Sequence, residues 1–400
     1  MGKIIAVNAG SSSIKFQLLD MPNEVVIASG IMERIGLEKG IFTIKYDGKK
    51  EETEPVLKDH AVGVELLLTS LVEKNIVASL NEITGIGHRV VQGGEFFKDA
   101  VVITENVISK IDELKDLAPL HNPAHIVGIR AFQKALPEVL QVAVFDTVFH
   151  QTMPEDTYMY ATPYKWYSEY GIRKYGAHGT SHNFVSNRAL QICRKNPGGT
   201  KIIVCHLGNG ASLCAVKDGK CIDTTMGLTP LEGIPMGTRC GNLDPTVLEV
   251  VARKENKSIE EVLSDFNKKS GYLGISGISS DARDVTAAMA EGDARAKLAF
   301  DIQAKRICDV IGSYYVLMGG LNAICFTAGM GENVCHLRAN ICNRLGVLGV
   351  ELDPVLNEVR GEEAKISSTK SKVNVYVIPT NEEVMIARDV VRLQCIKANK

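Results

Sequence analysis

The sequence contains a strand–loop–strand segment twice, about half a chain apart, and this repeat limits the possible folds more than any other feature. The first copy, residues 3–20, has an apolar run, a small polar turn at 8–13 and an alternating segment at 14–19. The second copy begins at Lys201 and keeps the lysine, two isoleucines and a loop glycine (Gly10 and Gly208) in register. β-Branched runs of this length predict strands, and repetition predicts a duplicated fold. Either hairpin alone is compatible with an ordinary turn, but the pair indicates two glycine loops that approach one phosphate chain.

Length and composition narrow the class of protein. A chain of 400 residues exceeds what one core usually holds, so we expect two domains. Its net charge of −2 argues against nucleic acid as a partner, and no apolar run reaches membrane-spanning length. We see no secretory signal and expect a cytoplasmic protein. The ten cysteines all lie from Cys193 onward without a C-x-x-C pair, which predicts reduced thiols rather than a disulfide framework or a zinc site.

Two polar residues follow predicted strands in the first half. Arg89 lies in the apolar strand 83–91, where it requires either a buried carboxylate or an anionic substrate as its partner. The strand ends in two glycines, so we favour the substrate. Asp146 follows the strand 140–145, at the end of a strand where ligands bind in α/β sheets, although a helix cap or a salt bridge explains it equally well.

Histidines and one arginine mark the following segments. We predict Asn122 as the N-cap of a helix at 124–134, with Pro123 in its first turn. The i, i+4 pairs at 121/125 and 178/182 each have one histidine outside a predicted helix, so we do not predict metal there. His178 instead precedes a helix N-terminus and suits a phosphoryl oxygen. Arg239 is the only base in the long loop 223–246, which favours a functional role.

Nine separated motifs together resemble the acetate kinase family. They are VNAGSSSIKF at 7–16, HRVVQGGE at 88–95, FDTVFH at 145–150, YGAHGTSH at 175–182, HLGNGAS at 206–212, MGTRCGNLDP at 236–245, GISGISSDARDV at 274–285, GMGEN at 329–333 and TNEE at 380–383. The resemblance runs along the whole chain. It implies the duplicated α/β fold of actin-like (ribonuclease H-like) ATPases, with an active-site cleft between two domains. We place these domains at 1–150, joined by a closing helix at 384–400, and at 151–383.

The resemblance also implies an activity and a set of residue roles. The implied reaction is reversible, direct in-line transfer of the ATP γ-phosphoryl group to acetate, with Mg²⁺ (Mn²⁺ as a substitute), in a homodimer. The implied catalytic residues are Asp146, His178 and Arg239, and Arg89 binds the substrate carboxylate. The implied metal ligands are Asn8 and Glu382. The implied nucleotide-binding residues are Lys15, His206, Leu207, Gly208, Asn209, Gly210, Asp281, Ala282, Arg283, Gly329, Met330, Gly331, Glu332 and Asn333.

Elementary chemistry agrees with most of these roles and leaves alternatives open. Phosphoryl transfer needs positioning and charge neutralisation, which two arginines, a histidine and a metal supply. Acetate is already ionised at neutral pH, so Asp146 is expected to position substrate or metal at least as much as to move protons. With Ala177, we expect a methyl pocket lined by Val91, Leu120 and Pro230. The alternatives are a kinase for propionate or another short carboxylate, and an actin-like ATPase that acts as a binding or filament module.

Overall fold

The computed structural model describes residues 2–119, 121–193 and 198–398, and the chain divides into two compact units. The first unit is Met1–Val148 with Asn381–Lys400, and the second is Phe149–Thr380. Each unit has its own sheet and its own buried apolar clusters. These boundaries place His150 in the second unit and Glu382 in the first, whereas the sequence motifs had suggested the reverse for both.

The first unit is built on a mixed sheet with the strand order β5-β4-β3-β2-β1-β6-β8-β7 in the part of the chain that the structure describes. Strands β1, β6 and β8 are parallel, while β2 and β3 are antiparallel to their neighbours. The strands are β1 (Lys3–Gly10), β2 (Ser13–Asp20), β3 (Val25–Glu33), β4 (Ile41–Tyr46), β5 (Lys49–Thr53), β6 (Ile83–Val90), β7 (Val101–Val102) and β8 (Leu140–Phe145). The helices are α1 (His60–Glu73), α2 (Glu105–Glu113), α3 (Asn122–Ala135) and α14 (Glu382–Ala398).

The second unit has a smaller sheet in the order β11-β10-β9-β12-β14-β13 over its described residues. Its strands are β9 (Lys201–Leu207), β10 (Ala211–Lys217), β11 (Lys220–Thr224), β12 (Ala323–Thr327), β13 (Ala364–Lys365) and β14 (Asn374–Val377). The helices are α4 (Glu155–Tyr158), α5 (Tyr164–Tyr170), α6 (Gly179–Ile192), α7 (Thr246–Glu255), α8 (Ile259–Lys268), α9 (Gly271–Ser276), α10 (Ala282–Ala290), α11 (Ala294–Met318), α12 (Ala328–Asn333) and α13 (Cys335–Arg344).

The two sheets share one topology, which confirms the predicted duplication. In the first unit the central order is β3-β2-β1-β6-β8, and in the second it is β11-β10-β9-β12-β14. In both, an antiparallel hairpin is followed by two strands parallel to the first one. The repeat that opens each half therefore supplies the central strand and its hairpin partner in each sheet.

The loop of the first hairpin is shorter than the sequence predicted. We expected a turn over residues 8–13, but β1 continues to Gly10 and pairs with β2 at Asn8↔Lys15 and Gly10↔Ser13. Only Ser11 and Ser12 form the turn. The ladder extends because its cross-strand hydrogen bonds satisfy backbone groups that a loop would leave to water. As a result, Asn8 and Lys15 lie directly opposite each other.

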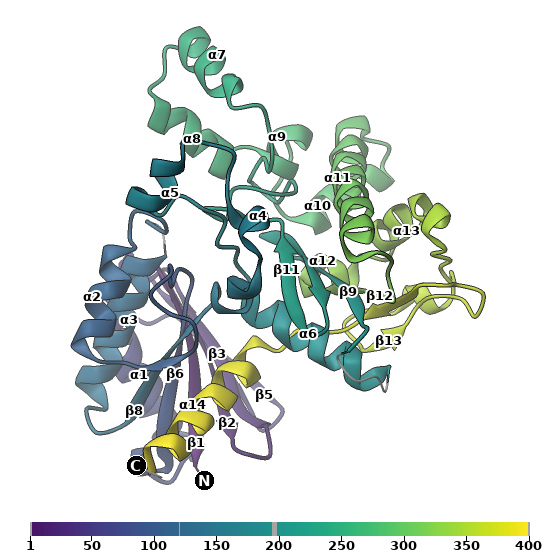
Figure 1. The fold of residues 1–400 in the computed structure, drawn as a ribbon. Helices are drawn as coiled ribbons and strands as arrows, with labels where there is room; N and C mark the ends of the chain where they lie inside the picture. Colours follow the sequence, from purple (N-terminus) through teal and green to yellow (C-terminus); the bar gives the residue numbers. More distant parts are fainter. Residues whose placement is uncertain (1, 120, 194–197, 399–400) are drawn as a thin grey trace. The chain divides into compact units, whose positions relative to one another are not determined.

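Helix α14, drawn in yellow in Figure 1, packs on β1, β6 and β8 of the first unit. Two glycines of β6 allow this close approach. A Cβ on Gly85 would lie 2.4 Å from Val390, and one on Gly87 would lie 2.2 Å from Ile386. This packing carries the start of α14 to the carboxyl ends of the parallel strands. No helix among the described residues is both long enough and apolar enough to cross a membrane.

Candidate active site

The carboxyl ends of three parallel strands gather polar side chains in the first unit. Val7 of β1 pairs with His88 of β6, so Asn8 and Arg89 are neighbours in register. Asp146 follows β8, and its N–H donates to the Val90 carbonyl oxygen at 2.9 Å. Because ligands bind at this edge of α/β sheets, the three side chains lie at a candidate binding position.

Arg89 finds its partner within the protein. Asp146 accepts from Arg89 at two points, with Oδ1 3.0 Å from Nε and Oδ2 2.7 Å from Nη2. A buried carboxylate, the less favoured of the two partners expected from the sequence, is therefore present. No described residue accepts a hydrogen bond from the third nitrogen, Nη1, so the pairing with Asp146 does not preclude an anionic substrate. Burial would lower the Arg89 pKa, but the carboxylates of Asp146 and Glu382 outweigh it and raise that pKa.

Two glutamates at the start of α14 add negative charge to this group. Glu382 Oε2 lies 3.6 Å from Arg89 Nε, and Glu383 Oε1 lies 2.6 Å from Lys15 Nζ. Burial raises the pKa of Glu382, Arg89 opposes this shift, and the neighbouring Asp146 and Glu383 raise the pKa further. Three carboxylates thus face two cations, which is a donor set suited to a hard divalent cation.

The segment after Arg89 is fixed by a buried asparagine. Asn122 does not cap α3, because its N-cap residue is His121. Its amide instead accepts from the Gln92 N–H (3.2 Å) and donates to the Gln92 carbonyl (3.1 Å). Asn122 is fully buried, and its long-range partners outcompete the local capping role that the sequence pattern favours.

The expected methyl-pocket residues fall in different places. Strand β6 ends at Val90, one residue earlier than predicted, so Val91 lies just beyond the strand, where it is buried. Strand alternation alone therefore no longer fixes its direction. Pro230 and the buried Ala177 belong to the second unit. Leu120 lies outside the described residues.

A network of histidines forms the centre of the second unit's site. His178 adopts a left-handed conformation (φ 58°) ahead of α6, and its Nδ1 lies 2.8 Å from Ser212 Oγ. The same hydroxyl lies 2.8 Å from His182 Nε2. His206 stacks on His178 with ring centroids 4.1 Å apart. A positive φ at a non-glycine residue is uncommon and concentrates at functional sites, so this geometry marks His178.

His182 belongs to the same network through its contact with Ser212. Burial and the neighbouring His150 and His206 lower the pKa of His182, which favours its neutral form. Neutral His182 can form a hydrogen bond with the Ser212 hydroxyl, which also contacts His178, and this adds no buried charge next to His178. His206 is fixed separately, since its Nδ1 lies 2.8 Å from Ser181 Oγ.

The side chains of Arg239 and His178 both lie next to the loop that contains Gly210. The position of a Cβ on Gly210 lies 3.4 Å from Arg239 Nη1 and 3.5 Å from His178 Nε2, so both side chains lie within van der Waals range of this glycine. Nη1 donates to the Pro230 carbonyl at 3.1 Å. No described carboxylate pairs with Arg239, and burial lowers its pKa. Because an arginine stays protonated in proteins and no described carboxylate pairs with this one, its guanidinium is available to an anionic ligand.

A cavity of about 880 Å³ lies beside this loop within the second unit. It is lined by eight residues that the motifs had assigned to nucleotide: Gly208, Asn209, Asp281, Ala282, Arg283, Gly329, Met330 and Asn333. His206, Leu207, Gly210, Gly331 and Glu332 do not line it, and Lys15 belongs to the first unit. The motifs missed several lining residues, namely Ser280, Thr286, Val334, Cys335, His336 and Arg360. Most of these adjoin a motif, but Arg360 comes from a distant loop that no spacing could indicate.

Two acidic residues near the cavity have structural partners. Glu332 Oε1 accepts from the N–H groups of Ala328 (2.7 Å) and Thr380 (3.2 Å), so it holds the turn after β12, where Ala328 has φ 63°. Asp281 caps α10 and pairs with the exposed Arg283, whose hydrogen bonds lower the Asp281 pKa to about 2. Asp281 is therefore part of the cavity wall, and Glu332 supports the turn that precedes the lining residue Gly329.

Comparison with known proteins agrees with this geometry. Residues 3–388 match the model of the acetokinase family. The chain is 59% identical to an acetate kinase of Acholeplasma laidlawii, over 98% of this chain and 99% of that protein. It is 57% identical to the acetate kinase of Shouchella clausii, over 98% and 100%.

Solved structures give the same result. The acetate kinase of Porphyromonas gingivalis superimposes with a TM-score of 0.94 at 43% identity, covering 98% of this chain and all of that one. A propionate kinase of Francisella tularensis gives a TM-score of 0.93 at 43% identity, with the same coverage. The matched length, the shared fold and the two sets of site residues lead to one conclusion: this chain belongs to the acetokinase family.

Proposed function

We propose that this protein is a kinase that transfers the γ-phosphoryl group of ATP to acetate, giving acetyl phosphate and ADP, in a reversible reaction. The observation that carries the proposal is the state of Arg89. It lies at a sheet edge beside a carboxylate cluster, and Asp146 occupies two of its three nitrogens. The pairing fixes the orientation of Nη1, and we propose that Nη1 donates a hydrogen bond to the acetate carboxylate.

In this mechanism Asp146 positions the acceptor. Its two-point pair fixes the plane of the Arg89 guanidinium, which in turn orients the carboxylate. Acetate attacks as an ionised carboxylate, so the step requires no general base. One oxygen of acetate forms a bond to the γ-phosphorus while the bond to the ADP oxygen breaks, and no covalent enzyme intermediate is needed.

His178 and Arg239 stabilise the charge on the transferred group. Both side chains lie close to Gly210, so a hydrogen-bonding ring and a cation are present at this loop. Charge spreads over the equatorial oxygens during phosphoryl transfer, and preorganised donors in a partly buried site stabilise it. We assign the nucleotide to the cavity lined by Asp281, Arg283, Gly329, Met330 and Asn333.

The first unit offers oxygen ligands for Mg²⁺, with Mn²⁺ as a substitute. Asn8 and Glu382 adjoin Arg89, within a group of three carboxylates and two cations. Hard oxygen donors of this kind fit Mg²⁺, which would neutralise phosphate charge when bound with the nucleotide. We further propose that the protein is a cytoplasmic homodimer.

Propionate is the second candidate acceptor, because a propionate kinase shares this fold at a TM-score of 0.93. Ala177 is small and buried, so it does not by itself close the acyl pocket. One methylene changes affinity in an apolar pocket by only about 1–3 kcal/mol, which makes discrimination partial.

Hydroxylamine trapping of the acyl phosphate tests the proposal. The full-length protein is incubated with ATP, Mg²⁺ and acetate, propionate or butyrate, and the hydroxamate and the ADP are both measured. We expect equal amounts of both products, with acetate the best acceptor. ATP hydrolysis that does not depend on carboxylate and gives no hydroxamate would instead indicate an actin-like ATPase.

A further inference from the structure

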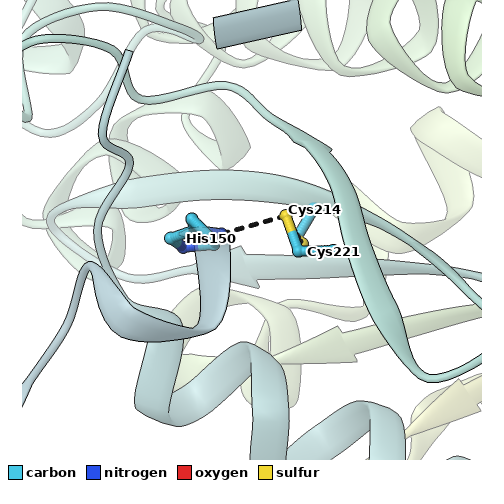
Figure 2. A group of neighbouring side chains, drawn as sticks. All are labelled: His150, Cys214 and Cys221. Atoms are coloured by element: carbon cyan, nitrogen blue, oxygen red, sulfur yellow. Dashed lines mark hydrogen bonds between the residues drawn. The ribbon is translucent and has the colours of Figure 1, made fainter. Parts of the chain in front are cut away.

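One histidine nitrogen and two cysteine sulfurs converge in the second unit, beside the segment that carries His178. His150, Cys214 and Cys221 are all buried, and their ligand atoms lie within 4.8 Å of one another. Figure 2 shows the three side chains pointing toward a common centre. His150 Nδ1 lies 3.1 Å from Cys221 Sγ, which lies 3.4 Å from Cys214 Sγ. The cysteines come from the adjacent strands β10 and β11, and His150 comes from the segment that enters the second unit.

One nitrogen of the histidine is oriented by a backbone carbonyl. His150 Nε2 lies 2.9 Å from the carbonyl oxygen of Ala177. A carbonyl oxygen can only accept, so Nε2 carries a proton, and in the neutral tautomer with this proton Nδ1 would present its lone pair to the sulfurs. Histidines that bind metal usually donate the other ring N–H to a carbonyl or carboxylate in this way.

From this geometry we propose that His150, Cys214 and Cys221 form a binding site for one thiophilic divalent cation of the Zn²⁺ class. In tetrahedral zinc sites, Zn–S bonds of about 2.3 Å and Zn–N bonds of about 2.0 Å separate two sulfurs by about 3.8 Å and a nitrogen from a sulfur by about 3.6 Å. The His150–Cys221 and Cys221–Cys214 separations are each about 0.4–0.5 Å shorter than these values, and the ligand atoms of His150 and Cys214 lie within 4.8 Å of each other.

The charge of the site also fits its surroundings. Two thiolates and one divalent cation sum to zero, and both thiol protons pass to solvent when the ion binds. The site borders an apolar cluster that includes Met153, Val204 and Val216, where a neutral centre is less costly than an isolated charge. Three protein ligands leave the fourth tetrahedral position to water or another small ligand.

The site is connected to the loop that carries His178. Gly176 lies against the ring of His150, since a Cβ on Gly176 would be 2.6 Å from Cδ2 of that ring. Ala177 accepts the hydrogen bond from the same ring and directly precedes His178. A shift of the His150 ring on metal binding would therefore pass to His178, and metal occupancy would change the rate of phosphoryl transfer.

Metal content and cobalt spectra test the site without relying on activity. The full-length protein is produced in medium containing Zn²⁺, dialysed anaerobically and measured for zinc per chain. We expect about one zinc per chain in the wild type and none in the Cys214→Ser/Cys221→Ser double variant. Cys325→Ser is the matched control, because Cys325 is a buried strand cysteine that the cluster does not include. It should retain the wild-type content.

Co²⁺ loading of the wild type provides a second measurement that needs no variant. A bound Co²⁺ should show a near-ultraviolet thiolate charge-transfer band that Zn²⁺ abolishes in competition. Equal zinc in wild type and double variant, or no thiolate band with Co²⁺, would overturn the proposal. The kcat for acyl phosphate formation reports only the coupling to His178, so failure of the proposed function would leave the binding result intact.

Discussion

Asp146 and Arg89 form a two-point ion pair in which the carboxylate is almost fully buried and the arginine side chain is 18% exposed. The pair links the ends of β6 and β8 and fixes the guanidinium at the sheet edge. The salt bridge is one of the alternatives that the sequence left open for Asp146.

Removing one member of this pair should destabilise the protein. Asp146→Ala leaves Arg89 largely buried without its partner, and breaking a buried pair costs about 3–5 kcal/mol. We expect a loss near the lower end of this range, because Arg89 is partly exposed. Urea unfolding measures the change. Arg89→Leu/Asp146→Leu is the control and should recover much of the stability, whereas a double variant as unstable as Asp146→Ala would contradict this account.

Arg239 should act mainly on the rate of phosphoryl transfer. Its guanidinium has no carboxylate partner among the described residues, so its charge is available to the transferred group. Arg239→Ala should lower kcat by about 10³–10⁵, the range for an arginine that stabilises phosphoryl transfer, with a smaller effect on the KM for acetate. The hydroxamate assay measures both. Arg239→Lys keeps the charge and should lose less, and a kcat for Arg239→Ala within a few-fold of wild type would exclude this role.

Val91 should limit the length of the acyl chain. It is buried directly after the strand that carries Arg89, and we expect its methyl groups to face a carboxylate held there. Val91→Ala should raise the ratio of kcat/KM for propionate over acetate by about 10–200-fold, the effect of one methylene in an apolar pocket. Val90→Ala makes the same truncation at a fully buried neighbour and should leave the ratio unchanged. An equal ratio in both variants would move the pocket wall to Leu120 or Pro230.

His88 should make stability depend on pH. Burial lowers its pKa to about 4, while its ordinary value is 6.5. Between these values the unfolded chain binds a proton that the folded protein does not. The contribution of His88 is therefore complete above pH 6.5 and is lost as the pH falls, by up to about 1.4 kcal/mol per pH unit.

His88→Gln tests this expectation, since glutamine can still donate to Gln141 Oε1, which lies 2.8 Å from His88 Nε2 in the wild type. The variant should show a flatter fall of unfolding free energy between pH 6.5 and 4.5, as measured by urea titration. Burial lowers the pKa of His125 to about 3, so His125 also makes the unfolding free energy fall with decreasing pH. This part of the pH dependence should be the same in the wild type and the variant. Identical slopes in the two proteins would contradict the assignment to His88.

Local patterns predicted the elements well and their long-range partners less well. The repeat at residues 3–20 and 201–219 predicted the duplicated sheet, because alternation and glycine loops act within a few residues. Asn122 shows the limit of such patterns. Its position before a proline indicates a cap, but its amide is bound by Gln92. Val91 was assigned to a strand that ends one residue earlier.

The sequence by itself determined the duplicated α/β fold, the strand that carries Arg89, the strand that precedes Asp146, and the loops that carry His178 and Arg239. Only the tertiary structure decided the pairing of Arg89 with Asp146, the part that Arg360 takes in the cavity and the convergence of His150 with Cys214 and Cys221. The reason is physical. Strand alternation and turns depend on neighbouring residues, whereas these contacts join residues far apart in the chain whose distances are set by how strands and helices pack.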